Sequence, residues 1–143
     1  VSEEILKALP VLYLAIFFTD DRDTLLSAAF ALGVGFAVLE NAVILAQNPA
    51  GVSIGWALAR VIGAALMHSA CTSTIGLGMS YINKRRKLFF CGTLSLLITA
   101  ILFHATFNVL VQSSYRIAAF ILPISLYLPV IVGRLRARKK DDQ

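Results

Sequence analysis

The sequence predicts an all-α integral membrane protein, a bundle of about five transmembrane helices in a single domain. Hydrophobic residues make up 58% of the 143 residues and charged residues only 15%, whereas soluble domains have about 45 to 50% apolar and about 25% charged residues. The apolar residues form long runs, several of them close to the roughly 20 residues that a helix needs to cross a bilayer. Short polar segments separate these runs, and a chain of this length fits one domain. The composition therefore indicates a membrane-embedded bundle with one shared core.

Each apolar run differs from the others in the polar residues that it carries. The first run begins with two acids and Lys7, which share one helix face. The loop after it ends at Asp23, which is the expected N-cap of the second run. The third is longer than a hydrocarbon core of about 30 Å requires, so we expect it to tilt. The fifth contains no ionisable residue and is expected only to pack. The five expected spans are residues 3–18, 24–48, 54–82, 88–112 and 117–133.

The distribution of basic residues predicts the orientation of the chain. Lysines and arginines concentrate in residues 84–87 and in the tail, residues 134–143, and short basic segments remain on the cytoplasmic side of a membrane. We therefore expect a cytoplasmic basic tail that frays at its end, and first residues that lie outside. Neither cluster has interleaved aromatic residues. The net charge of +5 thus indicates topology and a lipid environment rather than binding to nucleic acid.

Ionisable side chains from four spans fall in the outer half of the expected membrane. At about 1.5 Å per residue, Glu40 lies roughly 12 Å below the outer end of its span, and His104 lies at a similar depth in another. His68 is somewhat deeper, and the paired Glu3 and Glu4 lie at the outer end of the first span. An acid at the centre of a bilayer costs about 3 kcal/mol. We therefore expect these side chains to meet in a partly wet pocket that carries a function.

Two chemical arrangements can use such a cluster, and the first contains a metal ion. Glu40, His68 and His104 supply three ligands of the kind found in catalytic zinc sites, with a fourth position open to water. Zinc lowers the pKa of its water and polarises a carbonyl group, and Glu3 or Glu4 would act as the general base. The sequence has no HExxH motif, so this zinc site is predicted from residue types alone.

The second arrangement contains no metal. Glu3 or Glu4 activates water as a general base, while His104 and Asn108, one helical turn apart, donate hydrogen bonds to a developing oxyanion. Both arrangements hydrolyse an amide bond, and the sequence leaves the choice between them open. A proton- or cation-coupled transporter is the alternative function, because buried carboxylates and histidines also line such pathways. The lack of an internal repeat disfavours transport.

Several polar and small residues also have simpler interpretations. Lys7 can neutralise the paired acids. Arg60, about 10 Å below the outer surface, either extends to that surface or forms a bridge to Glu40. Glycines on neighbouring spans are expected to form packing surfaces where helices approach closely. These glycines are Gly33, Gly35, Gly76 and Gly78.

Four short motifs occur in order along the chain, each in its own span. Residues 3–7 (EEILK) match EExxK, residues 36–40 (FAVLE) match FxxxE, and residues 104–108 (HATFN) match HxxxN, with the lone histidine His68 between the last two. In this order the motifs resemble those of the PrsW family of intramembrane proteases, within the wider superfamily of CAAX-processing and bacteriocin-related membrane proteases. Each motif alone is weak. The four together make the resemblance specific over residues 2–108.

The resemblance implies a peptidase that cuts a membrane-anchored protein at or near the outer face, in the best-known case an anti-sigma factor, as the first cut of a signalling cascade. It implies that Glu3 and Glu4 supply the base, and that His104 and Asn108 form the oxyanion or metal site. The CAAX-processing branch has histidine where this chain has Glu40, which disfavours prenylated substrates. Family members carry helices before the paired glutamates, so we expect such helices upstream.

Overall fold

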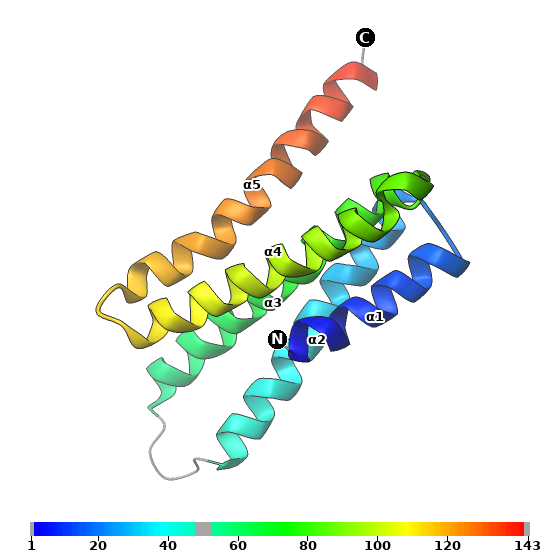
Figure 1. Ribbon diagram of the computed structural model, residues 1–143. Helices are drawn as coiled ribbons and strands as arrows, with labels where there is room; N and C mark the ends of the chain where they lie inside the picture. The colour runs from blue at the N-terminus through cyan, green and yellow to red at the C-terminus, as the bar shows by residue number, and fades with distance from the viewer. Residues whose placement is uncertain (1, 48–52, 142–143) are drawn as a thin grey trace.

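The fold is a bundle of five helices, which the computed structural model describes over residues 2–47 and 53–141 (Figure 1). Each expected span corresponds to one helix, and the described residues contain no strand. The predicted all-α fold is therefore confirmed. The helices are α1 (Ser2–Phe17), α2 (Arg22–Gln47), α3 (Ile54–Ile82), α4 (Arg86–Gln112) and α5 (Arg116–Asp141).

Three of these helices are long and apolar enough to cross a membrane. The qualifying segments are Arg22–Gln47 in α2, Ala57–Ile82 in α3 and Lys87–Gln112 in α4. In α5 the apolar part is shorter, Ile117–Leu128. With 16 residues, α1 is about 24 Å long, somewhat less than a hydrocarbon core of about 30 Å. The described residues thus contain three helices that can span a membrane, together with the short α1 and an α5 whose apolar part is shorter.

Two helix ends differ from the sequence prediction. Asp21 rather than Asp23 caps α2, because its Oδ2 accepts a hydrogen bond from the backbone N–H of Thr24 at 2.8 Å. Hydrogen bonds from the side chain and the backbone of Thr24 lower the pKa of the Asp21 carboxyl.

At the other end of the chain, α5 continues past Gly133 to Asp141, through most of the tail that was expected to fray. A single glycine lowers the stability of a helix by only about 1 kcal/mol relative to alanine, so Gly133 does not by itself end the helix.

The central helix of the bundle is α3, which contacts each of the other four helices. Its middle part is buried even where it is polar, including His68 and Thr72. The hydroxyl of Thr72 donates to the carbonyl oxygen of His68 at 2.8 Å, and that of Thr74 to Ala70 at 2.9 Å. These hydroxyls are therefore satisfied within their own helix and can pack against neighbours. Each of the other four helices therefore packs part of its surface against α3.

Two glycines bring α2 and α3 into close contact. A Cβ atom on Gly33 would lie 2.4 Å from the Cα of Ser69, and one on Gly76 would lie 2.7 Å from the carbonyl oxygen of Leu25. Backbone atoms cannot move aside as a flexible side chain can, so these positions require glycine. Around Gly35 nothing lies within 4 Å, and the predicted packing role is wrong for that residue. The packing role is confirmed for Gly33, Gly76 and Gly78.

Replacing Gly33 by alanine is expected to destabilise the protein, and Gly35→Ala is the matched control. The Gly33 substitution forces α2 away from the backbone of α3, an overpacking effect of about 1 to 3 kcal/mol. The Gly35 substitution meets open space and gains helix propensity of up to about 1 kcal/mol. Thermal unfolding of both variants in detergent micelles measures the difference. Equal melting temperatures would contradict the close approach of the two helices.

Candidate active site

A buried ion pair on α1 forms the first part of the site. The side chain of Glu4 is completely buried and that of Lys7 is 3% exposed. The ammonium group of Lys7 donates a hydrogen bond to Oε1 of Glu4, one turn earlier on the same helix. An ammonium group and a carboxylate can both remain charged in a dry environment only when each compensates the other. Glu4 and Lys7 therefore form one unit, as the sequence analysis expected.

The same ammonium group also contacts α3, a contact that the sequence analysis did not predict. Nζ of Lys7 lies 2.7 Å from Nδ1 of His68. On the other side of the ring, Nε2 of His68 lies 2.7 Å from Oε2 of Glu40 on α2. An ammonium group has no lone pair and can only donate, so Nδ1 accepts and Nε2 carries the proton that is donated to Glu40. His68 is thus a neutral ring held at both nitrogens.

His104 on α4 has a different arrangement. Its Nδ1 lies 2.6 Å from Oε1 of Glu4, and its Nε2 lies 3.8 Å from Oε2 of Glu3. The carboxylate of Glu4 accepts, so Nδ1 of His104 carries a proton, and Nε2 faces the carboxylate of Glu3. The rings of His104 and His68 lie edge to face with centroids 4.7 Å apart. The two imidazoles therefore share one small space.

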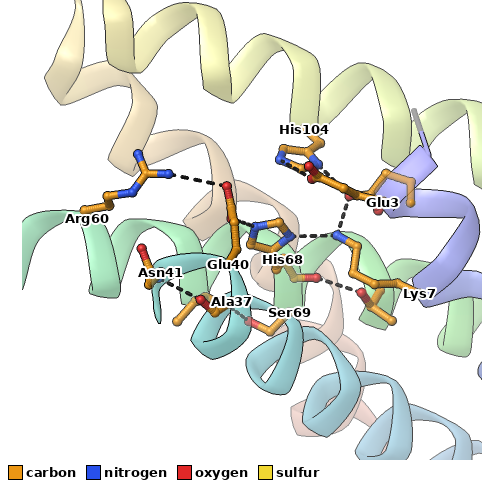
Figure 2. A network of polar contacts seen from close by, with 12 residues as sticks. Glu3, Lys7, Ala37, Glu40, Asn41, Arg60, His68, Ser69 and His104 are labelled. Carbon is orange, nitrogen blue, oxygen red and sulfur yellow. Dashed lines mark hydrogen bonds and ion pairs between the residues drawn. The ribbon is translucent and has the colours of Figure 1, made fainter. Parts of the chain in front are cut away.

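Glu40 extends the site toward the amino end of α3. Its Oε1 accepts a hydrogen bond from the guanidinium group of Arg60 at 3.3 Å. Arg60 therefore forms the bridge to Glu40 that was one of its two expected arrangements, rather than extending to the outer surface. A chain of polar contacts then leads from Arg60 through Glu40, His68 and Lys7 to the acids of α1 and to His104, and Figure 2 shows its members converging from four helices. The predicted convergence of acids and imidazoles is what the structure contains.

Asn108 is the one predicted site residue that lies apart from this cluster. Its side chain is exposed, whereas that of His104, one turn earlier on α4, is 7% exposed. Four residues on an α-helix advance by about 400°, so the two side chains share a stripe but not a direction. Among the described residues, no hydrogen bond joins Asn108 to the acids or histidines. The pairing of Asn108 with His104 as oxyanion donors stays a prediction.

The contact of Lys7 with His68 was not predicted from the sequence. The sequence placed Lys7 on the face of Glu3 and Glu4, which was the available signal, but it could not tell which residue of another helix would face that side. A buried lysine one turn after a buried acid needs a further acceptor for its remaining protons. The need for this further acceptor would have suggested His68 or His104 as the partner of Lys7.

The side chains of Glu3, His68 and His104 have the composition and placement that a metal ion needs. One ligand atom from each lies within 4.8 Å of the other two. Three protein ligands with an open fourth position are typical of catalytic zinc. In metal sites the second nitrogen of a ligating histidine usually binds a carboxylate, which orients the ring, and Glu4 and Glu40 occupy those positions here. Glu3 rather than Glu40 completes this set, because Glu40 contacts the protonated nitrogen of His68.

A helical membrane protein that gathers carboxylates and imidazoles from four helices into one buried cluster has the framework of an intramembrane hydrolase. The chain belongs to the PrsW family: the family model described as PrsW family intramembrane metalloprotease matches residues 1–134. The protein is therefore a membrane-embedded peptidase whose substrates are membrane proteins, and this assignment favours the peptidase over the transporter. Comparison with curated proteins and with solved structures gave no match.

Lys7 places a specific condition on metal binding, which leads to a prediction. Its ammonium group occupies the lone pair of His68, so a metal ion and Lys7 compete for the same nitrogen. Removing the ammonium group with Lys7→Met is expected to raise the apparent affinity for Zn²⁺ about tenfold, a common size for effects of groups next to metal ligands. Equilibrium dialysis followed by elemental analysis of the purified protein measures this affinity.

Lys84→Met is the matched control for the zinc measurement. Lys84 is an exposed lysine whose partner is Asp20 at 2.9 Å, at the end of the bundle away from the histidines. Its removal is expected to leave zinc affinity unchanged. If Lys7→Met binds zinc no better than Lys84→Met, and if zinc does not raise its melting temperature, the competition between Lys7 and the metal does not exist.

Proposed function

We propose that the protein is an endopeptidase that cleaves a membrane-anchored protein near the outer face of the membrane, such as the first cut in an anti-sigma factor. One observation carries the proposal. Glu3 is a half-exposed carboxylate whose Oε2 lies 3.8 Å from Nε2 of His104, at the edge of a cluster that is otherwise buried. Water and a peptide bond can reach this edge, whereas they cannot reach Glu4.

The exposure of the two paired acids supports different roles for them. Both carboxylate oxygens of Glu4 are buried, and its Oε1 already accepts from Lys7 and from His104. Glu4 is therefore a positioning residue that orients the ring of His104. The carboxylate of Glu3 is 43% exposed, so we assign the role of general base to Glu3. It takes a proton from the attacking water and delivers it to the leaving amine.

His104 and His68 face the same space and supply the polarising groups of the site. If a zinc ion were held by Glu3, His68 and His104, it would supply an activated water and a Lewis acid for the scissile carbonyl group, and Glu3 would then be a ligand rather than the base. In the metal-free alternative, His104 donates a hydrogen bond to the oxyanion. Asn108 lies one turn nearer the end of α4 and is exposed, where an incoming peptide would pass. We propose that it contacts the substrate there.

The proposed orientation puts this edge of the site in the outer half of the membrane. The loop between α1 and α2 and the loop between α3 and α4 lie at one end of the bundle, where Asp20 and Lys84 form an ion pair. Lys84, Arg85 and Lys87 make that end basic, which favours the cytoplasmic side. Glu3 and His104 belong to the opposite part of the bundle. The carboxyl-terminal tail then lies in the cytoplasm.

Substitution of each paired acid by glutamine tests the division of roles between them. Glu3→Gln is expected to lower cleavage by about 10²- to 10⁴-fold, the usual contribution of a general base, with little change in stability because the side chain is exposed. Glu4→Gln is expected to lower cleavage and also to destabilise the fold by about 3 to 5 kcal/mol, because it leaves the buried Lys7 uncompensated. Cleavage of a co-expressed single-span membrane protein and thermal unfolding in detergent measure the two effects.

Asp20→Asn serves as the control for the acid substitutions, because Asp20 is an exposed acid at the other end of the bundle. Its substitution is expected to leave cleavage unchanged. Cleavage that survives Glu3→Gln, Glu40→Gln and His104→Ala alike would remove the hydrolytic function. Retained cleavage in Glu3→Gln together with a stable but inactive Glu4→Gln variant would instead assign the base to Glu4.

A further inference from the structure

An apolar cavity of about 230 Å³ lies between α2 and α3, beside the acid that binds His68. Its walls are formed by five residues of α2 and two of α3: Ala37, Val38, Asn41, Ala42, Leu45, Val61 and Ala65. In Figure 1 the end of α2 and the start of α3 stand apart in this part of the bundle. All lining side chains are aliphatic except Asn41. The family assignment and the catalytic proposal do not account for this cavity.

Asn41 carries an unsatisfied acceptor at the cavity. The residue is 4% exposed, and its amide nitrogen donates to the carbonyl oxygen of Ala37 at 2.8 Å. Its Oδ1 is buried and has no hydrogen-bond partner among the described residues. Figure 2 shows this oxygen pointing away from Ala37. Buried acceptors in folded proteins are nearly always paired, so Oδ1 of Asn41, a residue that lines the cavity, still lacks a donor.

The chemistry of the cavity selects among the molecules that a membrane offers. A lipid acyl chain fills apolar space but has no hydrogen-bond donor. A transmembrane helix has aliphatic side chains, but its backbone N–H groups are bonded within the helix. A peptide that is locally unwound offers both an apolar side chain and a free backbone N–H. Such a peptide satisfies the aliphatic walls and Asn41 together.

We propose that the cavity is a substrate subsite, which holds an apolar side chain of an unwound stretch of the membrane-anchored substrate beside the scissile bond. Oδ1 of Asn41 accepts a hydrogen bond from the backbone N–H of that stretch. Glu40, the residue before Asn41, contacts His68, so the subsite adjoins the catalytic cluster. Consecutive residues of an extended peptide lie about 3.3 to 3.6 Å apart, and a bound residue therefore places its neighbours near the histidines. This inference rests on the proposed endopeptidase function.

Photo-crosslinking tests where the substrate lies. The probe is the single-span protein whose cleavage the preceding assay detects, with p-benzoylphenylalanine introduced in turn at the residues on either side of the cleaved bond. It is combined with the Glu3→Gln variant, which keeps the fold and does not turn over. We expect adducts on the α2 and α3 segments that line the cavity. Adducts confined to α4 or α5 would overturn the subsite.

Two substitutions test the subsite by kinetics, with Val43→Leu as the control because Val43 is exposed on α2 outside the cavity. Asn41→Leu keeps the side-chain size but removes the acceptor, so we expect roughly a three- to tenfold loss in kcat/KM, the range for one hydrogen bond. Ala65→Leu fills the cavity, and we expect about a tenfold shift in preference from large to small substrate side chains. The control is expected to change neither value.

The possible results separate the subsite from the function on which it rests. If no single-span protein is cleaved, both the function and the subsite are wrong. If cleavage depends on Glu3 and His104 but both cavity variants behave like Val43→Leu, the function stands and the subsite is wrong. In that case the cavity holds lipid. If Ala65→Leu fails to fold, Asn41→Leu and the crosslinked positions decide the question.

Discussion

The ammonium group of Lys7 is the interaction on which the site depends. It is buried between Glu4 of its own helix and His68 of α3, in a part of the bundle where an uncompensated charge would be very costly. The contact to Glu4 fixes that carboxylate, which in turn orients His104 on α4. A single cation therefore joins α1 to the two helices that carry the imidazoles, and the short α1 is held in the bundle by polar as well as apolar contacts.

The three acids of the site, Glu3, Glu4 and Glu40, make different contacts. Glu4 and Glu40 each bind one nitrogen of one histidine and so hold a proton on that nitrogen. Glu3 is left half-exposed beside Nε2 of His104. In the proposed function, chemistry at Glu3 and recognition beside Glu40 would fall at opposite sides of the same pair of rings. This arrangement suits a peptide that enters from the α2 and α3 side and is cut at the α1 and α4 side.

The helices and the convergence of polar groups were predictable from the sequence, and the pairing within the cluster was not. Long apolar runs determine where helices begin and end to within a few residues, except where a basic tail continues a helix past Gly133. Acids and histidines buried at the same depth in a membrane are expected to pair with one another, because an unpaired ionisable group there is costly. Which acid meets which histidine depends on how each helix is rotated about its axis. The contact of Lys7 with His68 and the exposure of Asn108 follow from rotations that no local pattern encodes.

The most direct test of the central interaction is a ¹⁵N NMR spectrum of the protein labelled at its two histidines, recorded in detergent or bilayers. Because Lys7 occupies Nδ1 of His68 and Glu4 binds Nδ1 of His104, the two rings are expected to differ in whether Nδ1 carries a proton. His68 should carry its proton on Nε2 only, and His104 should carry one on Nδ1. Rings that both exchange rapidly between tautomers, or that share one tautomer, would contradict a site ordered by Lys7.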